Sequence, residues 1–424
     1  MIGALAVCYR QAGWRVIGAA PTARAARELR EIAAIPSTTM HRLVAELDRA
    51  GSFEPGTVLV IDEAGMAPTR VSAALLAQAE RTSAKVIAVG DPGQLASVQA
   101  GGWLAALSRR QPGPELRDVI RQRDPSERNA LKALHDGQPD AYIAHKHDAI
   151  SVHAAENEAV DAITDEWDAA RREHGHTKAV MIARDNHTRE LLNQAARCRL
   201  KRDGTLPIGG VVVGRREYAR GDRVIARRND RARDVDNGTL GTVIDIDGRS
   251  HRMLVQTDSG QRRDLDLVYI VQHVEHAYAL TGHGAQGATV TWAGVIGRPE
   301  EFTREWAYTS LSRAREQTVL HITGEQPPAE LERRRYAPNQ PDGGRAEAIA
   351  ALRRAMKRVE AEPLAVEQSA HQELVKALTG HAMPSRSVVH QDQLGQPPPV
   401  RFSSSAPGRT PERSPPKRGP YLSL

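Results

Sequence analysis

Two adjacent carboxylates follow an apolar run near the start of the chain. VLVI, residues 58–61, leads directly into Asp62 and Glu63. A short β-branched run predicts a buried strand, and ligands of open α/β sheets bind at the carboxyl ends of such strands. Asp62 could hold hydrated magnesium there, and Glu63 could polarise a water for attack on a γ-phosphate. A strand end that simply turns into solvent could have the same sequence, so the pair alone does not decide between a phosphate site and a structural turn.

A second polar turn ends the next predicted strand. KVIAVG, residues 85–90, runs into GDPGQL, and Gly90 stands 28 residues beyond Asp62. Gly90 and Asp91 are expected at the same sheet edge as the carboxylates. Gln94 could hydrogen-bond both the γ-phosphate and the attacking water. A lone Gly-Asp-Pro turn is usually structural, but behind DEAGM at this distance it predicts a phosphate site.

These motifs, in their order, resemble those of the superfamily 1 helicases, and within them the RecD-like group that includes the helicase portion of conjugative relaxases. The resemblance covers about residues 1–324. It rests on six segments in order. APTARAAREL (20–29) is similar to the motif that grips single-stranded DNA, VIDEAGM to motif II and VGDPGQL to motif III. RDVIRQRD (117–124) is similar to motif IV, AYALTGHGAQGATV (277–290) to motif V and YTSLSRAR (308–315) to motif VI.

The resemblance implies two arginines that reach the nucleotide from the second domain, Arg121 of motif IV and Arg313 of motif VI. Guanidiniums in such positions neutralise charge that develops on a transferring phosphoryl group. Arg117 and Arg123 are close rivals to Arg121. For Arg313, the alternative is a surface salt bridge.

A path for single-stranded DNA across both domains is also implied, with 5′ to 3′ movement driven by ATP and Mg²⁺. Hydroxyls suit such a path because phosphate contacts position a strand without reading its bases. Gly284 stands where many relatives have lysine, so one salt-dependent phosphate contact is lost or moved. A buried, structural histidine is the alternative for His283. The implied DNA contacts are Thr22, Arg24, Thr281, His283 and Thr289, and the implied nucleotide contacts from motif V are Gln286 and Gly287.

One expected motif does not occur in these 424 residues. Carboxylates of this kind work with a G-x-x-x-x-G-K-[ST] loop, yet none of the eight lysines follows a glycine. In the resembled family that loop precedes a helix equivalent to the one predicted to begin at Met1. We therefore expect either a longer reading frame that supplies the loop or a genuine remnant. ATP hydrolysis by this chain stays open, and a non-catalytic remnant that binds DNA or a partner is the alternative function.

The order of predicted elements indicates an α/β protein. We predict two RecA-like parallel-sheet domains, a small inserted β-barrel, and a C-terminal region that is helical and then disordered. Short strands separated by NG, DG and SG turns predict the barrel, and nine prolines with seven serines predict the disordered tail. The predicted division is 1–113 for the first domain without its P-loop, 114–175 for a helical connector, 176–324 for the second domain with its Src-homology-type barrel at 205–272, 325–382 for a helical extension, and 383–424 for the tail.

Composition restricts the remaining functions. The net charge is +6, but residues 381–424 carry +4 of it, so charge alone supports nucleic-acid binding weakly. Two cysteines exclude a disulfide framework and a four-cysteine zinc site, which favours a cytoplasmic protein. No run approaches the ~20 apolar residues of a membrane span, so no membrane insertion is expected. Single-stranded DNA and other conjugation proteins are the partners that the resemblance implies.

Overall fold

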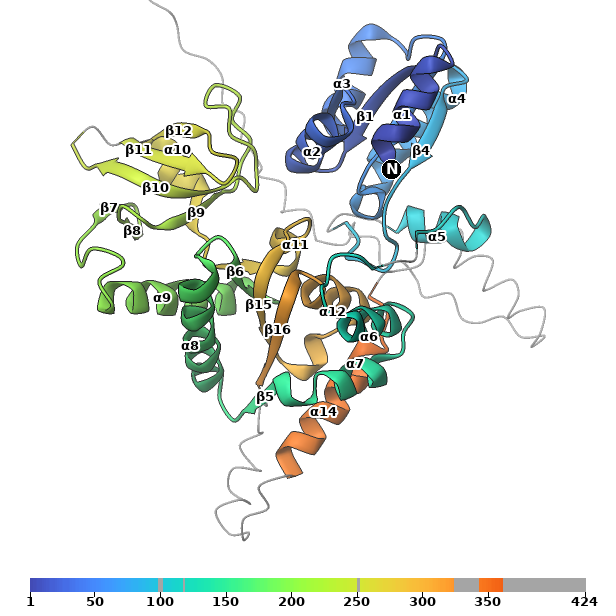
Figure 1. Cartoon of the computed structure of the whole chain (residues 1–424). Coiled ribbons are helices and arrows are strands. Elements are labelled where there is room, and N and C mark those ends of the chain that lie inside the picture. Colours follow the sequence, from blue (N-terminus) through green and yellow to red (C-terminus); the bar gives the residue numbers. More distant parts are fainter. Residues whose placement is uncertain (98–101, 117–118, 250–251, 324–342, 361–424) are drawn as a thin grey trace, which may run out of the picture. The chain divides into compact units, whose positions relative to one another are not determined.

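The computed structural model describes residues 1–97, 102–116, 119–249, 252–323 and 343–360 (Figure 1). The predicted disordered tail, and the predicted extension apart from residues 343–360, lie outside these residues. Within them, no helix is both long and apolar enough to cross a membrane. The strands form two parallel sheets, one antiparallel sheet and a two-stranded ribbon.

The first sheet has four parallel strands in the order β2-β1-β3-β4. Every residue of β3 is buried, since helices cover both of its faces. Val58 and Val60 pack with residues of α1 and α2, whereas Leu59 and Ile61 pack with residues of α3, α4 and α5. The elements are α1 (Ile2–Gln11), β1 (Arg15–Ala20), α2 (Ala23–Ala33), β2 (Ser37–Thr39), α3 (Met40–Ala50), β3 (Thr57–Ile61), α4 (Thr69–Arg81), β4 (Lys85–Ala88) and α5 (Trp103–Arg110).

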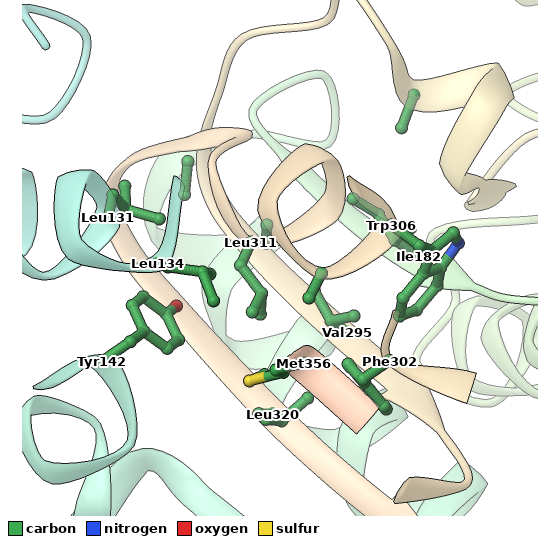
Figure 2. Packing of buried hydrophobic residues seen from close by; sticks show 14 of the residues in the cluster. Leu131, Leu134, Tyr142, Ile182, Val295, Phe302, Trp306, Leu311, Leu320 and Met356 are labelled. Atoms are coloured by element: carbon green, nitrogen blue, oxygen red, sulfur yellow. The ribbon is translucent and has the colours of Figure 1, made fainter. Parts of the chain in front are cut away.

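The second sheet has five parallel strands in the order β14-β6-β15-β16-β5. Helices α8 and α9 pack on one face, and α6, α7, α12 and α14 contribute to the core on the other (Figures 1 and 2). The elements are α6 (Pro125–His135), α7 (Pro139–His145), β5 (Ile150–His153), α8 (Glu156–His174), β6 (Ala179–Ala183), α9 (Asn186–Arg202), β14 (Ala279–Thr281), α11 (Gly282–Ala285), β15 (Val290–Gly297), α12 (Arg304–Leu311), β16 (Ala314–Thr323) and α14 (Gly343–Met356).

Strand β5 lies inside the segment that was predicted to be mostly helical. Its four residues pair with Leu320–Thr323 at the end of β16, which makes it an edge strand of the second sheet. Its sequence, ISVH, is not an unbroken apolar run like VLVI, and the strand's partner lies about 170 positions away in the sequence. Strand β2, only three residues long, was missed for the same reason.

Helix α14 is part of the core beside the second sheet. Leu352 and Met356 are fully buried, in the same cluster as Phe302 and Trp306 (Figure 2). The carbonyl of Arg358, just after the helix, accepts the Arg304 N–H at 2.9 Å. Burying a leucine or methionine side chain contributes about 1.5–3 kcal/mol to the free energy of unfolding. This burial holds α14 in place, and the hydrogen bond from Arg304 ties the start of α12 to the residues that follow α14.

The segment between α9 and β14 forms the small sheet, five antiparallel strands in the order β12-β11-β10-β9-β13, with the ribbon β7-β8 beside it. It has its own apolar core. The predicted α/β class with parallel-strand sheets is confirmed. The elements are β7 (Val211–Val213), β8 (Arg216–Tyr218), β9 (Arg223–Ala226), β10 (Leu240–Asp247), β11 (Arg252–Thr257), β12 (Arg262–Asp266), α10 (Leu267–His273) and β13 (Val274–His276).

A buried ion pair joins the small sheet to helix α9. Asp222 is fully buried and accepts two hydrogen bonds from Arg197, at 2.8 and 3.0 Å. The hydroxyl of Tyr278 donates to the same carboxylate at 2.7 Å. His276 lies next to this network, and its Nε2 hydrogen-bonds the Glu217 carbonyl at 3.1 Å.

The burial of His276 predicts an acid-dependent loss of stability. Desolvation lowers its pKa to about 4, although the Asp222 carboxylate opposes the shift. The unfolded chain takes up this proton near pH 6.5, so stability falls as pH drops from about 6.5 to 4, by up to about 3 kcal/mol. His276→Gln keeps a donor and removes the titration, so its thermal midpoint should fall less over this range. Exposed His41→Gln is the control, and parallel pH profiles for His276→Gln and the native chain would contradict the prediction.

Candidate functional site

The carboxylate pair occupies a strained turn at the end of β3. The Asp62 N–H donates to Ala19 O at 2.9 Å, which extends the pairing with β1, and Asp62 Oδ1 accepts the Glu63 N–H at 2.9 Å. Glu63 has a left-handed backbone, with φ 49°. Non-glycine residues rarely adopt this conformation, and it persists where surrounding contacts impose it. Here the next N–H, of Ala64, donates to Val89 O at 2.8 Å, beside the second polar turn.

The two polar turns touch through their backbones. A Cβ atom on Gly90 would lie 2.9 Å from the backbone nitrogens of both Ala64 and Gly65. A Cβ atom on Gly65 would lie 3.0 Å from Asp91 O. Gly90 was predicted as a nucleotide contact, and in the structure it allows this close approach, which a side chain would block.

Asp91 organises the second turn. Its carboxylate accepts the Gly93 N–H at 2.9 Å and the Gln94 side-chain amide at 3.0 Å. His135, the last residue of α6, contacts the same carboxylate through Nε2 at 3.0 Å. Burial opposes ionisation of Asp91, yet these hydrogen bonds lower its pKa overall, and Asp91 in turn raises the pKa of His135. His135 was missed because a lone histidine at a helix end has no distinguishing pattern.

Residues after Asp91 connect the first sheet to elements of the second. The Leu95 N–H donates to Thr309 Oγ1 on α12 at 3.0 Å, and its side chain belongs to the core beside the second sheet. The Gln286 amide donates to Gln94 Oε1 at 3.4 Å and also hydrogen-bonds Glu63. Gln94 is therefore held between Asp91 on one side and Gln286 on the other.

Two arginines lie on the other side of this site. Arg313 follows α12, is 1% exposed, and donates to Ser312 Oγ at 2.7 Å. Its Nε is buried without a hydrogen-bond partner among the described residues. Arg121 donates to Ser312 O at 2.9 Å. The rival Arg123 is largely exposed and pairs with Glu316, whereas Arg117 lies outside the described residues.

Charges at the site influence one another. Burial raises the pKa of Asp62. It also raises that of Glu63, which the Asp62 charge raises further while Arg313 lowers it. Burial, and then repulsion from Arg121, lower the pKa of Arg313 to about 9, and burial lowers that of Arg121. The two carboxylates and the two arginines form a set of charged groups that fits a magnesium ion and a triphosphate.

A cavity of about 1180 Å³ opens beside these groups. Gln94 and Arg121 line it, together with Asp91 and Tyr308. Its volume suits a ligand of nucleotide size. Among the described residues Asp62, Glu63 and Arg313 are not in its lining, so the cavity approaches the site from the side of Gln94.

The predicted DNA contacts are distributed over two places. Thr22 and Thr281 cap helices, and their hydroxyls accept the N–H groups of Ala25 and Gly284 at 3.1 and 3.3 Å. Arg24 donates to Gly287 O at 3.3 Å, which brings the first and fifth of the six motifs together. His283 is exposed, so the alternative of a buried histidine is wrong. Thr289 lines the nucleotide-sized cavity instead.

Comparison with known proteins shows which proteins this chain resembles. Residues 1–157 match a family model described as an AAA domain. The chain is 30% identical over 327 residues to a probable conjugal transfer protein TraA of Sinorhizobium fredii, covering 74% of this chain and 29% of that protein. It is 31% identical over 309 residues to the ATP-dependent RecD2 DNA helicase of Deinococcus radiodurans, covering 70% and 41%.

The chain is a homologue of conjugal transfer TraA proteins and of RecD helicases. It spans less than half the length of either relative described above. A solved Pif1 helicase from Bacteroides, in complex with ADP-AlF3 and single-stranded DNA, is similar at 18% identity over 79% of this chain and 89% of that one, with a TM-score of 0.49. The sequence relatives, and not this structural similarity, confirm the resemblance expected from the motifs.

The backbone contact at Gly90 predicts a clear effect of one methyl group. Gly90→Ala places a carbon against two backbone nitrogens that cannot rotate away, so we expect a loss of about 1–3 kcal/mol and a melting temperature lower by several degrees. Gly113→Ala is the matched control because nothing lies within 4 Å of its added Cβ atom. Equal melting temperatures for the two variants would show that the turns do not touch as described.

Proposed function

We propose that this chain is the motor portion of an ATP-dependent DNA helicase that moves along single-stranded DNA in conjugative transfer, in the 5′ to 3′ direction. ATP and Mg²⁺ would bind between the Asp62–Glu63 pair and the arginines Arg121 and Arg313. The observation that carries this proposal is the pair of hydrogen bonds, from Gln286 to Gln94 and from Leu95 to Thr309, that brings the end of the first sheet against motifs V and VI. Bound ATP supplies a phosphoryl group whose transfer to water releases energy for movement.

Each side chain has a role that follows from its environment. Asp62 holds the magnesium ion. Glu63, whose pKa is raised by burial, is suited to accept a proton from the attacking water. Gln94 is oriented by Asp91 and can report whether the γ-phosphate is present. Arg313 has an unpaired Nε with which to stabilise negative charge on the transferred group.

Hydrogen bonds near Gln94 could couple ATP hydrolysis to movement of the two sheets relative to each other. The bonds from Leu95 to Thr309 and from Gln286 to Gln94 join the two sheets beside the nucleotide site. Arg24 and Gly287 join them beside the residues proposed to hold DNA. A change in the hydrogen bonds of Gln94 on ATP hydrolysis would thus move the elements of both sheets that carry the proposed DNA contacts. Thr22, Arg24, Thr281 and His283 would grip phosphates there, while Thr289 lies nearer the nucleotide.

A second candidate is supported by the sequence itself. The 424 residues contain no glycine-lysine pair that could bind the β- and γ-phosphates. A non-catalytic module that binds DNA or another conjugation protein would need no such lysine. The two candidates differ in whether adding a phosphate-binding loop creates turnover.

The experiment measures DNA-stimulated phosphate release by the 424-residue chain and by a chain preceded by a G-x-x-G-x-G-K-T segment. We expect little release from the first and DNA-dependent release from the second, because the loop's amides and lysine complete the phosphate site. Substantial hydrolysis by the 424-residue chain would refute the need for the loop. An extended chain that binds DNA but stays inert would favour the non-catalytic module.

Glu63→Gln in the extended chain tests the role of the carboxylate. It should still bind ATP and DNA but lose about 10²- to 10⁴-fold in turnover, since the amide cannot accept the proton of water. Glu80→Gln, at an exposed position of α4, is the control and should keep full activity. Retained turnover in Glu63→Gln would assign proton acceptance to another residue.

A further inference from the structure

Three arginines surround two glutamates where the small sheet meets α9. Arg189 and Glu190 lie on α9, Arg216 on β8, Arg227 just after β9, and Glu275 on β13. Glu275 Oε2 accepts from Arg227 Nε at 2.6 Å and lies 3.1 Å from Arg189 Nη1. The Arg216 guanidinium is 3.5 Å from the Glu190 carboxylate and 3.8 Å from that of Glu275. The cluster thus has one positive charge more than it has negative charges.

Each of the three arginines has a buried N–H without an acceptor. Arg189 Nε, Arg216 Nε and Arg227 Nη2 have no hydrogen-bond partner among the described residues. A buried donor left unpaired costs about 1–3 kcal/mol. Excess positive charge and spare donors together indicate a site for an anion.

Arg227 is the member of the cluster that reaches the turn of motif V. Its side chain is 24% exposed, and a Cβ atom added to Gly284 would lie 3.8 Å from Arg227 Nη1. The same Cβ atom would lie 3.3 Å from the hydroxyl of Thr281. Since Gly284 has no side chain, the space beside this guanidinium stays open. Three residues further along the turn, Arg24 donates to Gly287 O at 3.3 Å, so the turn has two arginines beside it.

We propose that Arg227 binds a backbone phosphate of single-stranded DNA at the turn of residues 281–287, an inference that rests on the proposed function. Glu275 fixes Nε of the guanidinium and leaves Nη1, which lies beside Gly284, to face the phosphate. A charged N–H held in this way makes a short, strong hydrogen bond to a phosphate oxygen. The contact does not depend on base sequence, as movement along DNA requires. One residue of the small sheet thereby becomes part of the strand's path.

The test measures binding of the 424-residue chain to a fluorescent oligothymidine over a range of salt concentrations. Arg227→Gln should weaken binding roughly five- to tenfold at low salt. It should also reduce the slope of log K against log salt by about 0.7, the value for one lost phosphate contact on a single strand. Arg228→Gln is the control, because this neighbouring arginine is exposed and contacts His273 rather than the turn. Equal losses of DNA affinity in the two variants would show that the effect comes only from removing one positive charge anywhere on this surface, and would overturn the proposal.

Substitutions at Gly284 keep the proposal testable if Arg227→Gln is poorly folded. Gly284→Glu places a carboxylate beside the intact Arg227 and should weaken binding, whereas Gly284→Gln should weaken it much less. Equal weakening by Gly284→Glu and Gly284→Gln would overturn the proposal. Where Arg227→Gln folds normally, Gly284→Lys in that background returns a cation to the turn and should restore the salt slope, and failure of this rescue would also overturn the proposal.

Two further outcomes separate the explanations. If the native chain does not bind the oligothymidine, the proposed function itself fails. If it binds and Arg227→Gln binds with the same affinity and salt slope, only the assignment of Arg227 fails. Inorganic phosphate at constant ionic strength forms the last arm. The proposal would be overturned if phosphate competes with the oligothymidine for the native chain but not for Arg227→Gln, while the slope of log K against log salt is the same for both. The site would then bind a free anion rather than DNA.

Discussion

The structure depends on one electrostatic constraint, the placement of two half-buried carboxylates at the end of the first sheet close to Arg121, which is half-buried, and Arg313, which is buried. Arg313 is almost fully buried, and Glu63 is held beside Asp62 in a turn with a left-handed backbone. Burying charges costs several kcal/mol per ion unless each finds a partner. Glu63 and Arg313 partly compensate each other, and the remainder of the imbalance is what a metal-bound phosphate would satisfy.

Backbone contacts make this arrangement specific. The turns after β3 and β4 approach so closely that a methyl group at Gly90 would meet two backbone nitrogens. Asp91 then orients Gln94, while Leu95 inserts its side chain into the core beside the second sheet. Residues 88–95 therefore connect the end of β4, a candidate phosphate sensor and a second core. This continuity gives the proposed motor its link between nucleotide and movement.

Sequence patterns predicted those features that depend on neighbouring residues. The apolar runs of β3 and β4 indicated strands, and the carboxylates and Gln94 were identified because they follow these strands. Strands β2 and β5 were missed because neither is an unbroken apolar run. Arg121 and Arg313 came from the resemblance of their motifs, since nothing in their local spacing places them near Asp62.

Contacts between distant segments could not be predicted from the sequence. His135 meets Asp91 across 44 positions, and Arg227 approaches Gly284 from another sheet. Thr22 and Thr281 were predicted to contact DNA, yet their hydroxyls also cap helices, a local role that the letters equally allowed. The predicted domain boundaries stay predictions, and so do the roles of the site residues.

The most direct measurement of the central claim is the pKa of the Glu63 side chain, followed by NMR of selectively ¹³C-labelled glutamate and assigned with Glu63→Gln. In the native chain this pKa should lie above the ordinary value of about 4.3. In Arg313→Gln it should rise further, because the nearby cation that stabilises the ionised carboxylate is gone. An unchanged pKa in Arg313→Gln, with a native fold, would mean that the two groups do not share a site and would contradict the account.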